Sequence, residues 1–218
     1  MKRSTADVAR HRCRKILSRF RRTYPVAKCS LTYRNPLQLL LSTILSAQCT
    51  DNRVNQVTPA LFAKYRTAAD FARARQGDLE SLIRSTGFYK SKARSIQAAC
   101  ADIVALHNGR VPDSMEKLVT LRGVGRKTAS VVLGNAFGKA EGIAVDTHVM
   151  RLTQRMGITR QKTPEKIEHD LMAIVPRADW IEFTHYFIAH GRARCMARNP
   201  DCQHCEVAAL CPKIGVQK

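Results

Sequence analysis

Four cysteines and a lysine are the residues of this chain whose types and spacing could do chemistry. The cysteines crowd the end of the chain in the pattern C-x6-C-x2-C-x5-C, at Cys195, Cys202, Cys205 and Cys211. Four thiolates within seventeen residues can close around one metal centre. Zinc sites favour two Cys-x2-Cys pairs, and this segment has one, which counts against zinc.

The lysine, Lys127, follows a short turn that contains two glycines. The segment reads LRGVGRKTA, which predicts a helix that ends at Arg122, a turn through Gly123 and Gly125, and a second helix from Arg126. We expect left-handed torsions at both glycines and, at the start of the second helix, unpaired N–H groups that favour an anion such as phosphate. A turn with glycines for geometry alone is the alternative, but the neighbouring basic side chains favour phosphate.

The charge of the chain narrows the choice of partner. The chain has 37 Lys and Arg residues against 17 Asp and Glu residues, a formal net charge of +20, which attracts nucleic acid or an anionic membrane surface. The most apolar stretch, residues 37–45, is nine residues long and too short to span a bilayer. The Arg-rich N-terminus lacks the apolar core of a secretory signal, although its composition allows a mitochondrial-type transit segment. We therefore expect an intracellular protein that binds nucleic acid.

Helices must position these residues, because apolar side chains recur with helical spacing and no long stretch alternates with period two. Asn35 as N-cap and Pro36 at the first position introduce a helix with one buried stripe. A second helix is capped by Thr50 or Asp51 and is kinked at Pro59. The other predicted helices cover residues 68–75, 78–84, 91–109, 115–121, 126–137, 147–156 and 164–175, with a last one around Trp180 to Ile188. The predicted fold class is all-α.

Four sequence motifs precede the cysteines in a fixed order: LSAQCTD at 45–51, GFYKSKA at 87–93, LRGVGRKTASVVLGNAFG at 121–138 and IAVDTH at 143–148. Together with the four cysteines, and over residues 30 to 211, they resemble the endonuclease III family of iron–sulfur DNA glycosylases. The resemblance implies a [4Fe-4S] cluster on those cysteines. It also implies a six-helix domain with the helix-hairpin-helix at residues 29–139, a discontinuous cluster domain from residues 1–28 and 140–218, and a DNA-binding groove between these two helical lobes.

The resemblance gives Lys127 the role of nucleophile and Asp146 that of catalytic carboxylate. An amine can attack C1′ of a damaged nucleotide, displace the base and remain as a Schiff base, which permits β-elimination of the 3′ phosphate. The carboxylate could accept a proton in transit and stabilise positive charge on the sugar. The alternatives are a lysine that only contacts phosphate and an aspartate that caps the helix beginning at Thr147, and Asp146 could do both.

The resemblance also assigns residues to the extrusion of a nucleotide from duplex DNA. Gln48 looks like the residue inserted into the vacated space, and Phe88 like the wedge against the orphaned base. A solvated helix end and a core residue are the alternatives for these two. Asp51 and His148 look like residues of the base pocket, with a helix cap and a surface histidine as their alternatives.

Other basic residues and cysteines have simpler expected roles. The cluster would hold its segment so that Arg192, Arg194 and Arg198 contact the DNA backbone. The alternative is that these three arginines only keep the surface soluble. Arg122 and Arg126, at the glycine turn, are also expected to bind DNA phosphate. The stretch Arg10 to Arg22 carries seven basic residues and no acid. It is either a second contact to the DNA backbone or a solvated basic helix. The remaining cysteines are expected to be free thiols in or near the core, at Cys13, Cys29, Cys49 and Cys100.

The sequence departs from the family pattern at three places. Arg122 stands where proline is usual, which predicts a looser and more basic hairpin. One extra residue lies between Phe137 and Ile143, on the connection to Asp146. Phe88 replaces a usual leucine, which bears on how opposite bases are tolerated.

The expected function is therefore excision of oxidised or ring-damaged pyrimidines from double-stranded DNA, with cleavage 3′ to the abasic site, by a monomer associated with the nucleoid in the cytoplasm. A monofunctional mismatch glycosylase of the same superfamily is one alternative, and Lys127 counts against it. A protein that only binds DNA is the other.

Overall fold

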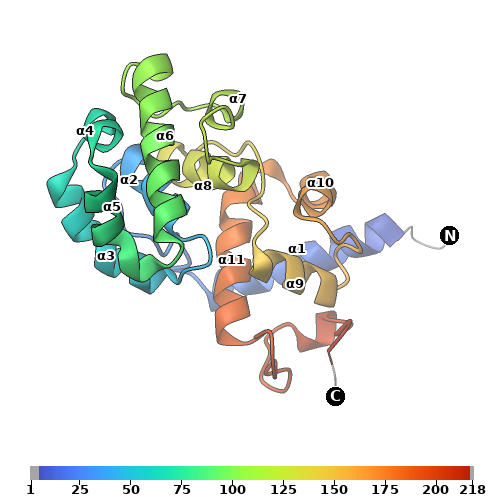
Figure 1. Ribbon diagram of the computed structural model, residues 1–218. Coiled ribbons are helices and arrows are strands. Elements are labelled where there is room, and N and C mark those ends of the chain that lie inside the picture. The colour runs from blue at the N-terminus through green and yellow to red at the C-terminus, as the bar shows by residue number, and fades with distance from the viewer. Residues whose placement is uncertain (1–4, 217–218) are drawn as a thin grey trace. The chain divides into compact units, whose positions relative to one another are not determined.

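The computed structural model describes residues 5–216, with side chains from residue 7 onward. Over that range the chain is all-helical and has no strand, which confirms the predicted fold class (Figure 1). The α-helices are α1 (Thr5–Thr23), α2 (Pro36–Leu45), α3 (Asp51–Lys64), α4 (Ala68–Arg73), α5 (Gln76–Ile83), α6 (Tyr89–His107), α7 (Met115–Leu118), α8 (Arg126–Phe137), α9 (Thr147–Arg155), α10 (Pro164–Ile174) and α11 (Trp180–Ala193). Short 3-10 helices are η1 (Arg84–Thr86), η2 (Arg177–Asp179) and η3 (Ala208–Leu210).

Two compact units make up the chain. Cys29–Glu141 forms the middle unit, and the segments that end at Lys28 and begin at Gly142 form the terminal unit. The division into two domains, residues 29–139 and residues 1–28 with 140–218, stays a prediction. The DNA-binding groove between these domains also stays a prediction.

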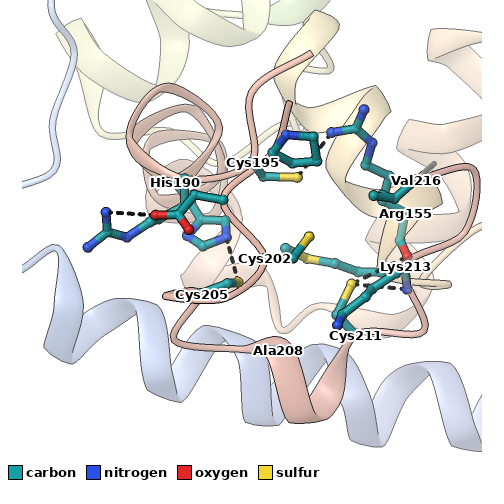
Figure 2. A pocket seen from close by; sticks show the side chains of 13 residues that line it. Arg155, His190, Cys195, Cys202, Cys205, Ala208, Cys211, Lys213 and Val216 are labelled. Carbon is teal, nitrogen blue, oxygen red and sulfur yellow. Dashed lines mark hydrogen bonds and ion pairs between the residues drawn. The ribbon is translucent and has the colours of Figure 1, made fainter. Parts of the chain in front are cut away.

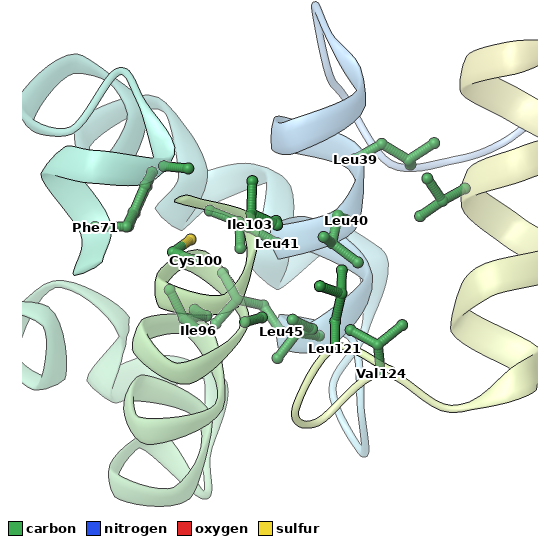
Figure 3. Close-up of a cluster of buried hydrophobic side chains, with 14 of the residues drawn as sticks. Leu39, Leu40, Leu41, Leu45, Phe71, Ile96, Cys100, Ile103, Leu121 and Val124 are labelled. Carbon is green, nitrogen blue, oxygen red and sulfur yellow. The ribbon is translucent and has the colours of Figure 1, made fainter. Parts of the chain in front are cut away.

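Helix α2 lies within the core of the middle unit. Asn35 Oδ1 accepts a hydrogen bond of 2.9 Å from Gln38 N, and Pro36 takes the first helical position, as predicted. Every residue from Leu39 to Leu45 is buried, so the prediction of one buried stripe is wrong. The helix packs against α3, α6 and α8, and its side chains reach neighbours on opposite sides (Figure 3). A helix surrounded in this way needs apolar residues all round.

Side-chain caps begin the next helices. The Thr50 hydroxyl accepts from Arg53 N at 3.3 Å, so Thr50 and not Asp51 caps α3, which continues through Pro59 to Lys64. Thr67 and Asp70 form a reciprocal capping box at the start of α4. The predicted boundaries are wrong by two or three residues at four helices: α4 and α7 end earlier than predicted, α5 begins earlier, and α6 both begins and ends earlier. Helix ends fray into turns that periodicity does not resolve.

The terminal unit is built around aromatic residues. Helix α1 buries Ile16, Leu17 and Phe20, and the Phe20 ring meets the Phe187 ring edge-on at 5.5 Å between centroids. Phe187 also stacks on Phe183 at 4.1 Å. The basic stretch in α1 is therefore one exposed face of an amphipathic helix whose other face anchors it to α11.

Four cysteines lie outside the C-terminal group. Cys13 and Cys100 are buried and Cys29 and Cys49 are half-buried, all as free thiols, which confirms their predicted placement. None of the helices described here is long and apolar enough to cross a membrane.

Candidate functional site

The turn between α7 and α8 depends on one glycine in a left-handed conformation. Gly123 has a φ of +80°, and a Cβ at this position would lie 3.0 Å from the Cβ of Ser95. Leu121 and Val124 on either side are buried, and Val124 N donates to Leu121 O at 3.0 Å (Figure 3). Backbone torsion and the space available therefore both require glycine at position 123, in a turn anchored to the core.

Gly125 contributes in a different way from the one predicted. Its φ of −91° and ψ of 171° are extended, so the prediction of a left-handed torsion there is wrong. The turn reverses at Gly123 alone, and Gly125 is the N-cap of α8, where no side chain forms a capping hydrogen bond. A Cβ added to Gly125 would meet nothing within 4 Å. The open end leaves the first N–H groups of α8 available to an anion.

Lys127 is the second residue of α8, and its side chain is exposed. The neighbouring Arg126 is exposed too, so both basic side chains stand at the open, positive end of the helix. This placement suits either of the roles considered for Lys127, attack on a sugar carbon or contact with a phosphate.

Arg122 lies before the turn and has an acidic partner. Its backbone N donates to Asp102 Oδ2 at 2.9 Å, and its Nη2 lies 2.9 Å from Asp102 Oδ1. Hydrogen bonding to Arg122 lowers the pKa of the Asp102 carboxyl. The pair ties the turn to α6 and offsets the charge of Arg122. The Asp102 carboxylate therefore competes with DNA phosphate for this side chain, and the DNA contact of Arg122 stays a prediction.

Two exposed side chains of the middle unit stand at turns with unusual backbone torsions. Gln48, between α2 and α3, has a φ of 51°, and Phe88, directly before α6, has a φ of 49°. Phe88 is 65% exposed, so the alternative of a core residue is wrong. Left-handed torsions at non-glycine residues are uncommon and cluster at functional sites. Their insertion into DNA stays a prediction.

Four residues after Phe88 is a buried lysine, Lys92, which the sequence does not mark as buried. Lys92 is 5% exposed, its Nζ donates to Thr86 O at 2.8 Å, and burial lowers its pKa. The Thr86 hydroxyl in turn donates to Ile83 O at 2.8 Å. The ammonium thus fixes the carbonyl that precedes Gly87 and Phe88. A lysine in the first turn of a helix gives no sequence signal of burial, because lysine is almost never buried.

Asp146 is the N-cap of α9. Its Oδ1 accepts from Val149 N at 2.8 Å, which confirms the capping role. Asp146 is half-buried, and capping engages one carboxylate oxygen, so a second role for the other oxygen remains open. His148 is half-buried beside Arg151, whose Nη2 lies 3.2 Å from His148 Nδ1. The pocket role of His148, like that of the half-buried Asp51, stays a prediction.

Helix α9 is joined to the cysteine segment by arginines that the sequence analysis also misses. Arg151 donates to Cys195 O through Nε at 3.1 Å and Nη2 at 2.8 Å, and to Gly191 O at 3.2 Å. Arg155 donates to Met196 O at 2.7 Å. The helix that carries Asp146 at its N-terminus is therefore bonded along its length to the start of the cysteine segment. These contacts span 40 or more positions of sequence, which helical periodicity cannot predict.

The four predicted metal ligands line one cavity. Cys195, Cys202, Cys205 and Cys211 surround a space of about 350 Å³ that is partly open to solvent, and their sulfurs face one another across it (Figure 2). Arg155 Nη1 donates to Cys195 Sγ at 3.4 Å, and Lys213 N donates to Cys211 Sγ at 3.4 Å.

The chemistry of this cavity fits a cationic metal centre. Burial raises the pKa of the Cys205 thiol to about 11 and also raises that of Cys211, so a lone thiolate is disfavoured there. A bound metal offsets that cost, because a coordinated thiol is deprotonated outright. Four soft sulfur donors with hydrogen-bond donors behind them are the ligand set of an iron–sulfur or zinc centre.

The three arginines predicted to meet DNA have different surroundings. Arg194 is half-buried and lies 3.4 Å from Asp201 Oδ2 and 3.3 Å from Glu206 Oε1, so it braces the cysteine segment. Arg192 and Arg198 are exposed. DNA contacts at all three stay predictions.

Comparison with known proteins identifies the family. Residues 41–177 match the family of HhH-GPD superfamily base excision DNA repair proteins. Endonuclease III of Synechocystis sp. is 53% identical over 203 residues, which cover 93% of each chain. This chain belongs to the endonuclease III family. The predicted resemblance is thus confirmed, and the chain is a base excision DNA repair protein.

Solved structures agree with this assignment. The structure of a non-covalent endonuclease III–DNA complex superimposes with a TM-score of 0.90 at 43% identity and covers 94% of this chain and 95% of that one. A trapped endonuclease III–DNA covalent intermediate, an estranged-adenine complex, matches with the same score and identity over 94% of this chain and 96% of that one. The helices described above are therefore those of an endonuclease III fold.

Proposed function

We propose that this DNA glycosylase and AP lyase removes oxidised or ring-damaged pyrimidines from double-stranded DNA, with Lys127 as nucleophile and Asp146 as catalytic carboxylate. The observation that carries the proposal is the exposed amine at the second position of α8, beside an uncapped, positive helix end that a phosphate can occupy. A covalent intermediate with DNA has been trapped for a relative of the same fold, as expected for a lysine nucleophile.

The reaction begins at the deoxyribose. The nitrogen lone pair of Lys127 attacks C1′ as the C1′–N bond breaks, and the base leaves with that electron pair and takes up a proton. The nitrogen now bonded to C1′ loses a proton, the C1′–O4′ bond breaks, and O4′ takes up a proton, which leaves an iminium between Lys127 and C1′. The iminium acidifies C2′; a base removes a C2′ proton, and the C3′–O bond breaks to release the 3′ phosphate. Water then frees Lys127.

Asp146 supports this sequence with the oxygen that the cap leaves free. A carboxylate stabilises positive charge on the sugar as the base departs, and it can accept a proton from the attacking amine. The capping bond from Val149 N fixes the side chain, so its orientation does not depend on substrate. The turn at Gly123 and the open N-terminus of α8 hold the backbone phosphate that sets the register of the sugar.

The extruded nucleotide leaves a gap that the exposed Gln48 and Phe88 fill. Their left-handed torsions present both side chains away from the core at defined angles. Asp51 and His148 contribute to the pocket that receives the damaged base.

The four cysteines hold a [4Fe-4S] cluster. When bound, it cross-links a segment that has little apolar core of its own and so supplies structural stability. Together with Arg151 and Arg155, the cysteines fix the segment that presents Arg192 and Arg198 to the phosphate backbone. The enzyme acts on DNA as a monomer in the cytoplasm.

Borohydride trapping tests the proposal. Duplex DNA with a single thymine glycol, mixed with the enzyme and reductant, is expected to give a covalent adduct for the wild type and none for Lys127→Ala. Lys64→Ala removes another lysine of the middle unit, paired with Asp78 at 3.3 Å, and is expected to trap normally. DNA binding by the wild type without any adduct would favour a protein that only binds DNA, and base release without strand cleavage would favour a monofunctional glycosylase.

A further inference from the structure

His190 lines the cysteine cavity, and the proposed reaction gives it no role there. Its side chain is fully buried, in the last turns of α11. The imidazole Nε2 lies 3.5 Å from Cys205 Sγ (Figure 2). The other ring nitrogen, Nδ1, lies 2.8 Å from the Tyr24 hydroxyl. The ring also packs against Phe20 at 4.4 Å between centroids. Both ring nitrogens are therefore in contact with polar atoms, in a place that fixes the ring.

The ligand state of Cys205 decides which nitrogen carries the proton. A free thiol can donate its hydrogen to Nε2, which leaves the ring proton on Nδ1, 3.6 Å from the buried Oε2 of Glu206. A cysteine bound to metal has no hydrogen to donate. Nε2 must then carry the proton, because two acceptors in contact without a hydrogen are unfavourable in a buried site. The Tyr24 hydroxyl, which can rotate, completes the chain by donating to Nδ1.

Two of the other sulfurs have donors of their own. Arg155 donates to Cys195 Sγ and the backbone N of Lys213 donates to Cys211 Sγ. His190 completes this pattern at Cys205, from a helix that contributes no ligand. Partners of this kind orient metal ligands and adjust the electron density on them.

We propose that His190, oriented by Tyr24, is a positioning residue for the metal centre: its Nε2–H donates to the sulfur of Cys205 and thereby tunes and retains the cluster. The proposal rests on the iron–sulfur assignment made above. A hydrogen bond donated to a ligand sulfur stabilises the more negative, reduced form of a cluster, so it raises the reduction potential. It also opposes loss of the ligand from the metal.

Three variants separate the hydrogen bond from packing. His190→Phe keeps an aromatic ring and removes both ring nitrogens, His190→Gln keeps an amide N–H donor, and Tyr24→Phe removes only the hydroxyl that faces Nδ1. Phe187→Leu is the control, since it disturbs the same aromatic packing through Phe20 without touching a cysteine. Each protein is purified with its cluster, and two quantities are measured: the reduction potential on DNA-free protein and the rate at which a chelator bleaches the visible absorbance of the cluster.

His190→Phe is expected to shift the potential to a more negative value and to lose its cluster about tenfold faster than the wild type. His190→Gln is expected to restore most of both quantities, and Tyr24→Phe to shift both in the same direction as His190→Phe by less. Phe187→Leu is expected to lower the melting temperature without shifting the potential. Should His190→Phe not accumulate in folded form, Tyr24→Phe and His190→Gln decide the question.

Equal potentials and bleaching rates in the wild type, His190→Phe and Tyr24→Phe would overturn the inference, and so would an equal shift in Phe187→Leu. Failure of the underlying assignment gives a different result: iron analysis of the wild type would then find zinc or no metal, before any variant is compared.

Discussion

At the scale of single residues, the two glycines of the hairpin show how one residue type serves two purposes. The sequence predicts left-handed torsions at both, yet Gly123 alone has a positive φ, while Gly125 is extended and lies at the open end of α8. Spacing identifies the turn but not which glycine reverses the chain, and the close contact of Gly123 with Ser95, in a helix distant in sequence, is not visible in the spacing either.

Alanine at the two positions is therefore expected to act differently. Gly123→Ala should lower the free energy of unfolding by about 1–2 kcal/mol for the left-handed torsion, with more for crowding against Ser95. Gly125→Ala should cost less than about 1 kcal/mol, because its torsions suit any residue, and should weaken DNA binding by placing a methyl group at the helix end. Thermal unfolding and DNA titration of both variants check this; a larger stability loss at Gly125 would contradict it.

The Arg122–Asp102 pair gives a prediction on pH. The folded-state pKa of Asp102 is lowered, so the pair stabilises the protein above the ordinary aspartate pKa of about 4, and the contribution disappears as pH falls through the lowered pKa. Arg122→Ala should raise the Asp102 pKa toward its ordinary value. A carboxyl chemical-shift titration of both proteins measures it, and an unchanged Asp102 pKa in the variant would show that the arginine is not the cause.

At the scale of elements, the start of α6 couples a buried charge to an exposed aromatic ring. Lys92 holds the carbonyl of Thr86, and Thr86 leads directly into the strained turn at Phe88. Sequence reasoning finds Phe88 through the family motif, but the lysine that supports it is visible only once the 3-10 helix η1 brings the carbonyl to the ammonium.

If Lys92 acts through the position of Phe88, their substitutions should not be additive. Lys92→Met and Phe88→Ala are each expected to lower kcat/KM for base excision, and the double variant to lose little more than the worse single variant. Lys90→Met, an exposed lysine two residues earlier, is the matched control and should retain activity. Fully additive losses in the double-mutant cycle would mean that Lys92 supports the fold by another route.

At the scale of the whole molecule, the net charge of +20 includes arginines that the fold itself uses. Arg194 is held by Asp201 and Glu206, whereas Arg198 is exposed. Arg198→Ala is expected to reduce the slope of log affinity for DNA against log salt by about 1, with little change in melting temperature. Arg194→Ala is expected to lower the melting temperature instead, because it removes the cation that both Asp201 and Glu206 contact. The reverse pattern would contradict this division.

The sequence carries much of the fold and part of the site. Caps and apolar spacing locate α2, α3 and α8 closely because these signals are local, and cysteine spacing marks the residues that line one cavity. Other features join residues far apart in the chain: the burial of α2 on all sides, the hydrogen bond from Arg151 to Cys195 O, and the contact of His190 with Cys205. Such contacts depend on tertiary packing, which periodicity does not encode.

The central claim concerns a single amine, and peptide mapping of the borohydride-reduced adduct tests it most directly. After digestion of protein and DNA, tandem mass spectrometry is expected to find the deoxyribose remnant on the peptide that contains Lys127, attached to its Nζ. A remnant on any other lysine, the buried Lys92 included, would contradict the account.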